Sequence, residues 1–134
     1  MNTICKIKES EISYKIVDYI YTNYNEDLNS KDVSNKFGIN AIELNYHLKY
    51  LVEKNFECFL NYVRITKSVK LLLHTEDTIS QIAYQVGYNS IRTFNRNFKK
   101  FYNTNPAKFR TQVQIQKNKH CYIENYIAVF LYLI

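Results

Sequence analysis

The most constraining feature of this 134-residue sequence is an internal repeat. Residues 33–39 read VSNKFGI and residues 82–88 read IAYQVGY, an offset of 49 positions. Both follow the order apolar, small, two variable residues, apolar, Gly, apolar. Downstream, two apolar residues and a lysine recur at an offset of 50, with Leu44, Leu48 and Lys49 in the first copy and Phe94, Phe98 and Lys99 in the second. The chain therefore carries two copies of one structural unit, the second with one extra residue in its turn.

Each position of the repeat suits a helix-turn-helix, in which two short helices cross steeply at a tight turn. A small residue at the crossing, Ser34 or Ala83, lets the two backbones approach. Gly38 or Gly87 ends the first helix in the left-handed conformation, which most other residues adopt only at a cost in free energy. Because both copies keep the whole pattern, we predict two helix-turn-helix units.

The composition favours an all-α fold of seven helices. The chain has only 2 Gly and 1 Pro, too few for a many-stranded β fold, whose turns recur about every 8–12 residues. Apolar spacing and capping residues predict helices from Ser10 to about Asn23, Ser30 to Gly38, about Asn40 to Lys54, Phe56 to His74, Thr78 (a capping box with Gln81) to Gly87, Ser90 to about Phe101, and Asn105-Pro106 through Arg110.

Arg64 begins an apolar stretch of the fourth of these helices. We expect it to be a structural ion-pair or backbone partner more than a DNA contact.

Positive charge is concentrated in the second half of the chain. Residues 1–77 hold 10 Lys/Arg and 11 Asp/Glu, whereas residues 78–134 hold 8 Lys/Arg and the single acid Glu124, a net charge of +7. The acid-free stretch from Thr78 to Ile123 is either the electrostatic footprint of a polyanion or an ordinary solvated basic surface. Charge alone does not decide between the two.

The second helix of each unit has an outward face suited to duplex DNA. Leu44, Leu48 and Leu51 are expected to face inward in the first unit, and Phe94, Phe98 and Phe101 in the second. On the opposite face of each helix, the residues at positions i, i+3, i+4 and i+7 then form one exposed stripe. Asn and Arg pair bidentately with adenine and guanine edges in the major groove, and Lys suits phosphates. The candidate DNA-binding residues are Asn40, Ile42, Asn45, Tyr46 and Lys49 in the first unit and Ser90, Arg92, Thr93, Asn95, Arg96, Lys99 and Lys100 in the second. The alternative is an ordinary polar helix face, and in the first unit Glu43 and Glu53 would repel phosphates.

The second copy belongs to a longer motif, which reads ISQIAYQVGYNS at residues 79–90 and FNRNFKK at residues 94–100, followed by Asn105-Pro106 and Phe109-Arg110. This motif closely resembles the signature of the AraC/XylS family of transcription regulators. Phe56, Phe59 to Arg64 and Leu71-Leu72 are similar to the family's central linking helix. The resemblance covers about residues 10–112.

The resemblance implies two homeodomain-like helix-turn-helix subdomains joined by the long central helix. It implies that the two recognition helices occupy successive major grooves, about 34 Å apart, on one face of the DNA. The base-reading positions implied are Ile42, Asn45 and Tyr46 in the first unit and Arg92, Asn95 and Arg96 in the second. Family members usually activate transcription by contacting RNA polymerase, so promoter DNA and RNA polymerase are the expected partners.

Two departures from the family pattern stand at helix ends. The family commonly has Gly where this chain has Glu53 and Asn103. Asn tolerates the left-handed conformation, so Asn103 is a mild change, whereas Glu53 is harder to accommodate after the first recognition helix.

We assign residues 1–112 to the DNA-binding domain and residues 113–134 to a C-terminal tail of unknown role. The apolar end of the tail, residues 126–134, is shorter than the roughly 20 residues of a membrane span, and it packs on the domain, mediates association or promotes aggregation. Many family members carry a separate effector domain; we expect none in this chain, which we take to be a free-standing short regulator or a fragment. We therefore expect no small-molecule effector.

The sequence has no pattern for catalysis or for a cofactor. His47, His74 and His120 have no metal-ligand spacing, and two glycines cannot build a phosphate loop. We expect Cys58 to pack, and three widely spaced cysteines indicate reduced thiols in a cytoplasmic protein. The family resemblance implies a bacterial, nucleoid-associated protein. We predict a non-enzymatic transcription regulator, most simply an activator, that binds DNA sequence-specifically. The competing hypothesis is a truncated regulator that binds RNA polymerase or another regulator and has weak DNA affinity.

Overall fold

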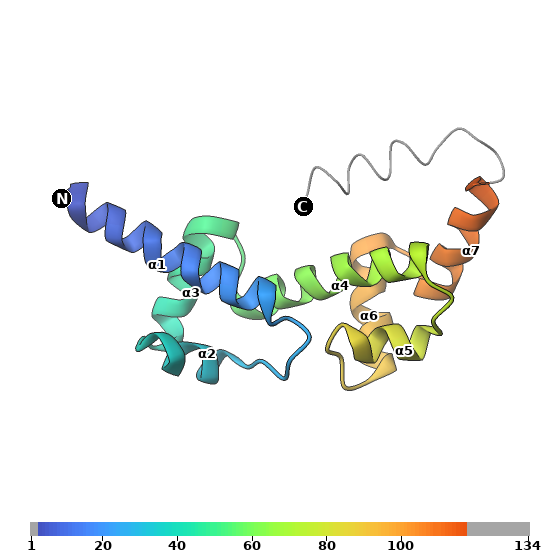
Figure 1. The fold of residues 1–134 in the computed structure, drawn as a ribbon, viewed down its shortest axis with the longest axis horizontal. Coiled ribbons are helices and arrows are strands. Elements are labelled where there is room, and N and C mark those ends of the chain that lie inside the picture. Colours follow the sequence, from blue (N-terminus) through green and yellow to red (C-terminus); the bar gives the residue numbers. More distant parts are fainter. Residues whose placement is uncertain (1–2, 118–134) are drawn as a thin grey trace. The chain divides into compact units, whose positions relative to one another are not determined.

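The computed structural model describes residues 3–117, which form helices joined by short turns (Figure 1). These residues contain no strand, so the all-α prediction is confirmed. The elements are α1 (Thr3–Thr22), α2 (Ser30–Phe37), α3 (Ala41–Val52), α4 (Phe56–His74), α5 (Ile79–Gln85), α6 (Ile91–Tyr102) and α7 (Pro106–Lys117).

The helices at the two ends of the described range are longer than predicted. Helix α1 begins at Thr3, not Ser10, and α7 continues past Arg110 to Lys117. The apolar end of the predicted tail lies outside the described residues, since these stop at residue 117. No helix among residues 3–117 is long and apolar enough to cross a membrane.

Side chains of the preceding residues fix where several helices begin. Asn29, and not the predicted Ser30, caps α2, because its Oδ1 accepts the backbone N–H of Asp32 at 2.9 Å. The capping box predicted at the start of α5 is present. The N–H of Gln81 donates to Thr78 Oγ1 at 3.1 Å, and the N–H of Thr78 donates to Gln81 Oε1 at 2.8 Å.

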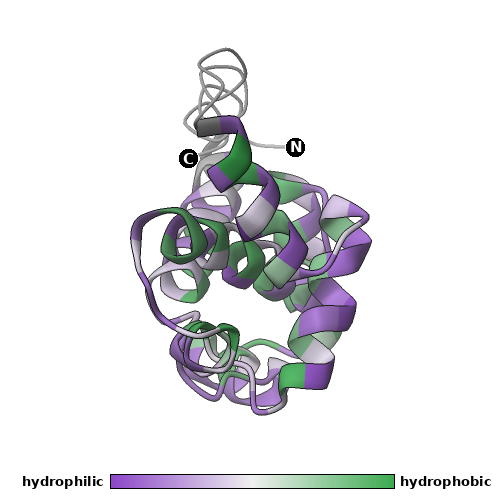
Figure 2. Cartoon of the chain, turned by 90° about the vertical axis from the view of Figure 1, so that its right-hand side faces the viewer, coloured by the Kyte–Doolittle hydropathy of each residue, from purple (hydrophilic) through white to green (hydrophobic). Residues whose placement is uncertain are grey.

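The described residues divide into two compact units, with the boundary inside α4 between Arg64 and Ile65. Each unit has its own apolar core, and Figure 2 shows apolar and polar residues alternating along the helices. The first core is formed by residues of α1 to α4, namely Ile16, Ile20, Val33, Leu44, Leu48, Phe56, Phe59, Leu60 and Val63.

The second core is largely aromatic. Phe94 and Phe98 of α6 are completely buried, and their rings lie 5.9 Å apart. The ring of Phe98 also lies 4.9 Å from Tyr102 and 5.4 Å from Phe109 of α7. These rings occupy the inner face of α6, so Phe101, predicted to face inward, is instead 43% exposed.

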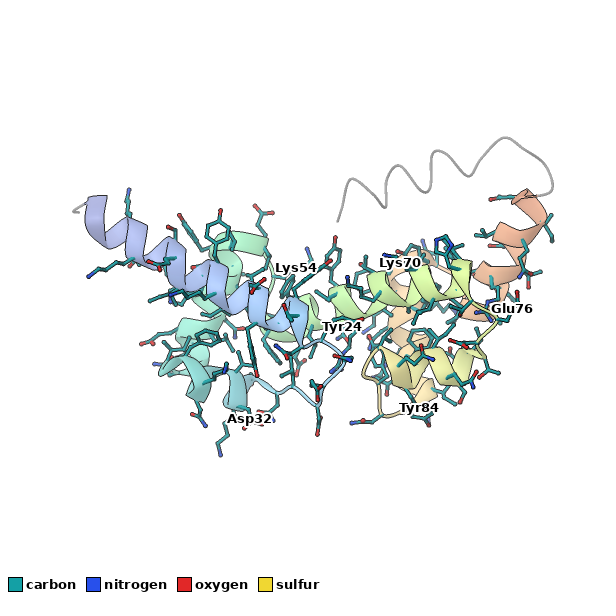
Figure 3. All side chains as sticks on the ribbon, in the orientation of Figure 1. Tyr24, Asp32, Lys54, Lys70, Glu76 and Tyr84 are labelled. Carbon is teal, nitrogen blue, oxygen red and sulfur yellow. The ribbon has the colours of Figure 1, made fainter. Side chains whose placement is uncertain are left out.

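One arginine in each unit ties a helix to the loop that precedes the unit's helix-turn-helix. Arg64 donates through Nε to the carbonyl of Tyr24 at 2.7 Å and through Nη2 to the carbonyl of Glu26 at 2.9 Å, and Figure 3 shows Tyr24 at this loop. The prediction of Arg64 as a backbone partner is confirmed. In the second unit Arg110 has the same role, with bonds to the carbonyls of Leu72 (3.1 Å), Thr75 (3.3 Å) and Asp77 (2.6 Å).

Candidate nucleic-acid interface

The first unit forms a helix-turn-helix from α2 and α3. Gly38 ends α2 with a φ of 65°, in the left-handed region. Its N–H donates to the carbonyl of Asn35 at 3.2 Å, and the N–H of Ile39 donates to the carbonyl of Ser34 at 3.0 Å. Ser34 is buried at the crossing, and its Oγ donates to the carbonyl of Ser30 at 2.6 Å.

The second unit repeats this turn between α5 and α6. Gly87 has a φ of 101°, and its N–H donates to the carbonyl of Tyr84 at 3.1 Å. The N–H of Tyr88 donates to the carbonyl of the buried Ala83 at 3.0 Å, which is the bond from Ile39 to Ser34 shifted by 49 positions. The repeat seen in the sequence is therefore a repeat of hydrogen bonds.

Helix α6 presents a stripe of cations. Its exposed residues include Arg92, Arg96, Lys99 and Lys100, and the helix contains no acidic residue. Among residues 3–117, none of these four side chains forms an ion pair or a hydrogen bond. Their positive charge is therefore available to an anionic ligand.

Helix α3 presents apolar surface at the equivalent positions. Ile42, Tyr46 and Tyr50 recur every four residues along one face and are 81%, 57% and 60% exposed. Lys49 is exposed and is the single cation of this helix, and the exposed Glu43 lies in its first turn. Tyr50 is missing from the predicted site residues, although its spacing of four from Tyr46 would have placed it on the same stripe.

The two asparagines predicted to read adenine turn their amide oxygens toward the protein. Oδ1 of Asn45 accepts the backbone N–H of Phe56, the first residue of α4, at 3.0 Å. Oδ1 of Asn95 is buried and has no hydrogen-bond partner among residues 3–117. A bidentate contact with adenine needs this oxygen and the amide nitrogen together, so the structure favours a positioning role for Asn45.

The remaining predicted residues lie at the starts of the recognition helices. Oδ1 of Asn40 accepts the N–H of Glu43 at 2.9 Å, and Oγ of Ser90 accepts the N–H of Thr93 at 3.4 Å. Thr93 itself is half-buried. These helix starts carry a partial positive charge, which suits phosphate groups.

Among the side chains that the structure describes, no histidines, cysteines or carboxylates form a group that could hold a metal ion. Nδ1 of the buried His47 lies 2.9 Å from Ser13 Oγ, and that hydroxyl donates its proton to the carbonyl of Glu9 at 2.9 Å. His47 therefore donates to Ser13, a structural role. Cys58, predicted to pack, is exposed because Phe56 and Phe59 occupy the inner face of the first turn of α4. His120 and Cys121 lie outside the described residues.

Residues 33–112, which contain both helix-turn-helix units, match the model of a helix-turn-helix domain family. The chain belongs to the AraC/XylS family. Like other members of this family of DNA-binding transcription regulators, it has two helix-turn-helix units in an all-α domain.

Curated relatives from staphylococci are similar to the chain over most of its length. The lactose operon transcription activator of Staphylococcus xylosus is 33% identical over 107 residues, which are 77% of this chain and 37% of that protein. An uncharacterized HTH-type transcriptional regulator of Staphylococcus aureus strain MSSA476 is 31% identical over 113 residues, 84% of this chain and 15% of that protein. The chain thus spans well under half of the length of these relatives.

Solved structures share the fold. The C-terminal domain of AraT, a response regulator from Geobacillus stearothermophilus, is 28% identical with a TM-score of 0.72, and the match covers 75% of this chain and 84% of that one. The DNA-binding domain of AdpA in complex with a target DNA has a TM-score of 0.75 over 79% of this chain and 96% of that one. At 13% identity, the second match shows the fold alone.

Proposed function

We propose that the chain binds double-stranded promoter DNA sequence-specifically, with α3 and α6 as the recognition helices of its two units. The observation that carries this proposal is the basic stripe of α6, formed by Arg92, Arg96, Lys99 and Lys100. Arginine pairs bidentately with guanine in the major groove, and lysines neutralise phosphates. Helix α3 corresponds to α6 in the repeat. The proposed site therefore has two halves, one for each of two successive major grooves.

We further propose that the bound protein activates transcription by contacting RNA polymerase, on the nucleoid of a bacterial cytoplasm and without catalytic activity of its own. The name of the Staphylococcus xylosus relative, a transcription activator, supports this role. A promoter fusion tests it. Expression of the chain should raise reporter output from a promoter that carries the selected site, and unchanged or lowered output would contradict activation.

Selection from a pool of random duplexes tests DNA binding directly. The chain should enrich a motif with two half-sites about 10 base pairs apart, and Arg96→Ala should lose roughly 1–3 kcal/mol of binding free energy at one half-site. Lys70→Ala is the matched control, because Lys70 is an exposed cation of the same unit as Arg96. Figure 3 shows Lys70 on the side of α4 away from α5. Weak, fully salt-sensitive binding that is indifferent to Arg96 would overturn the proposal.

A second candidate function is that of a protein-interaction module with weak DNA affinity of its own. The exposed apolar stripe of α3, with Glu43 beside it, favours this alternative. The same selection separates the two, since an interaction module would enrich no motif but would still be retained by RNA polymerase or by another regulator.

A further inference from the structure

The two recognition helices occupy equivalent places in the repeat, but the outward face of α3 is apolar where that of α6 is cationic. Ile42 and Tyr46 of α3 stand where α6 has Arg92 and Arg96, at an offset of 50. Between Ala41 and Leu48, α3 has no Lys or Arg. The first unit therefore lacks the arginine donors that recognise guanine in the second.

Two polar side chains beside this face form hydrogen bonds within the protein. Oδ1 of Asn45 accepts the N–H of Phe56, and the carboxylate of Glu43 accepts from Nδ2 of Asn40 at 3.3 Å. What α3 presents outward in its first two turns is the side chain of Ile42, 81% exposed, and the ring of Tyr46, 57% exposed. In the major groove, the base-edge group that matches apolar surface is the C5-methyl of thymine.

We infer that the first unit recognises a thymine-rich half-site by packing Ile42 and Tyr46 against the C5-methyl groups of thymines, whereas the second unit supplies the ionic contacts and the reading of guanine. This inference rests on the proposed function, namely that α3 enters the major groove. Tyr46 also contacts the folded unit on one side. Its ring lies edge-on to His47 at 5.5 Å, and His47 is fixed by its hydrogen bond to Ser13. A thymine methyl group at this face would thus meet a tyrosine ring that already packs against the folded unit.

A docking protein is the other possible ligand of this stripe, and the repeat favours DNA. The start of a recognition helix is the part that contacts base edges, and Ile42 is the second residue of α3 just as Arg92 is the second residue of α6. The two helices also follow turns with the same hydrogen bonds. Both residues are therefore placed for the same ligand.

Replacing thymidine by 2′-deoxyuridine removes the methyl group and leaves base pairing intact. We would measure the affinity of the chain for a selected duplex and for versions with deoxyuridine in one half-site or in the other. The half-site whose base preferences are relaxed by Arg96→Ala belongs to the second unit. In the other half-site, each contacted methyl that is removed should weaken binding roughly fourfold. Deoxyuridine in the half-site of the second unit should have no such effect.

The variant Ile42→Ala completes the test. Because Ile42 is exposed, this substitution leaves the folded core unaffected. This variant should bind the thymidine and deoxyuridine duplexes with affinities that differ less than those of the wild type. Arg96→Ala is the matched control and should keep the full deoxyuridine effect.

If Arg96 reads its half-site but deoxyuridine changes the affinity in neither half-site, the methyl inference fails and the proposed function stands. If no duplex motif is selected at all, the proposed function fails. If Ile42→Ala leaves DNA binding unchanged but abolishes retention by RNA polymerase, the stripe binds protein and the inference is overturned.

Discussion

The amide oxygen of Asn45 accepts the backbone N–H of Phe56 at 3.0 Å, and this bond ties the middle of α3 to the first residue of α4. In the second unit the equivalent residues, at an offset of 50, are Asn95 and Pro106. Proline has no N–H, and Oδ1 of Asn95 is buried without a hydrogen-bond partner among residues 3–117. The second copy thus keeps the asparagine and lacks its donor.

This difference predicts unequal effects of truncating the two asparagines. Asn45→Ala should lower the free energy of unfolding by about 1 kcal/mol more than Asn95→Ala, because only the first change breaks a hydrogen bond. Alanine raises helix propensity equally at both positions, so the pair of variants isolates the bond. Urea unfolding followed by circular dichroism measures both values. Equal costs would show that the bond between Asn45 and Phe56 contributes nothing to stability.

The ends of α3 and α6 predict stabilising substitutions. Glu53 has a φ of 57° and Asn103 a φ of 55°, where glycine is preferred. Glu53→Gly should therefore raise the free energy of unfolding by about 1 kcal/mol, and Asn103→Gly should raise it less, because Asn adopts this conformation more readily. Glu53→Gln is the control for charge and should leave the thermal midpoint unchanged. A Gln variant as stable as the Gly variant would assign the effect to the carboxylate.

The sequence predicts the parts of the fold that local chemistry determines. The left-handed glycines in the turn of each helix-turn-helix, the capping box at Thr78 and the extent of α4 all follow from residues close together in the chain. The structural role of Arg64 was also predictable, because a lone cation at the start of an apolar stretch needs an internal partner. Its particular partners were not, since they lie about 40 residues earlier.

The orientation of side chains at the edge of a helical face depends on tertiary contacts. Asn45 and Asn95 lie at the border between the buried and exposed faces, so periodicity alone places them outward, whereas the N–H of Phe56 draws the oxygen of Asn45 inward. Phe101 has the spacing of a buried residue, yet Tyr102 and Phe109 occupy the space beside Phe98. The start of α1 has no regular apolar spacing and was missed for that reason.

The hydrogen bonds of Arg64 and Arg110 to backbone carbonyls predict that the shape of the guanidinium group, and not its charge alone, stabilises each unit. Arg110 donates from three nitrogens to three carbonyls, a fan that the single ammonium of lysine cannot reproduce. Arg110→Lys should therefore lower the free energy of unfolding by about 2 kcal/mol. Arg64→Lys should also lower it, because it disrupts the bonds from Nε and Nη2 to the carbonyls of Tyr24 and Glu26. Thermal unfolding of both variants measures this, with the exposed Lys108→Arg as the control. A lysine variant as stable as the wild type would show that charge alone suffices.

The asymmetry between α3 and α6 predicts which substitutions change the salt dependence of DNA binding. Each cation that neutralises a phosphate contributes about 0.9 to the slope of log affinity against log salt concentration. Lys99→Ala and Lys100→Ala should each reduce the slope by about that amount, whereas Ile42→Ala should lower affinity and leave the slope unchanged. Lys15→Ala is the control, because Lys15 pairs with Glu11 at 3.2 Å in α1. Affinities measured at four or more salt concentrations give the slopes. If removal of Lys99 and Lys100 leaves the slope intact, the phosphate contacts lie elsewhere, and the basic stripe of α6 is a solvated surface.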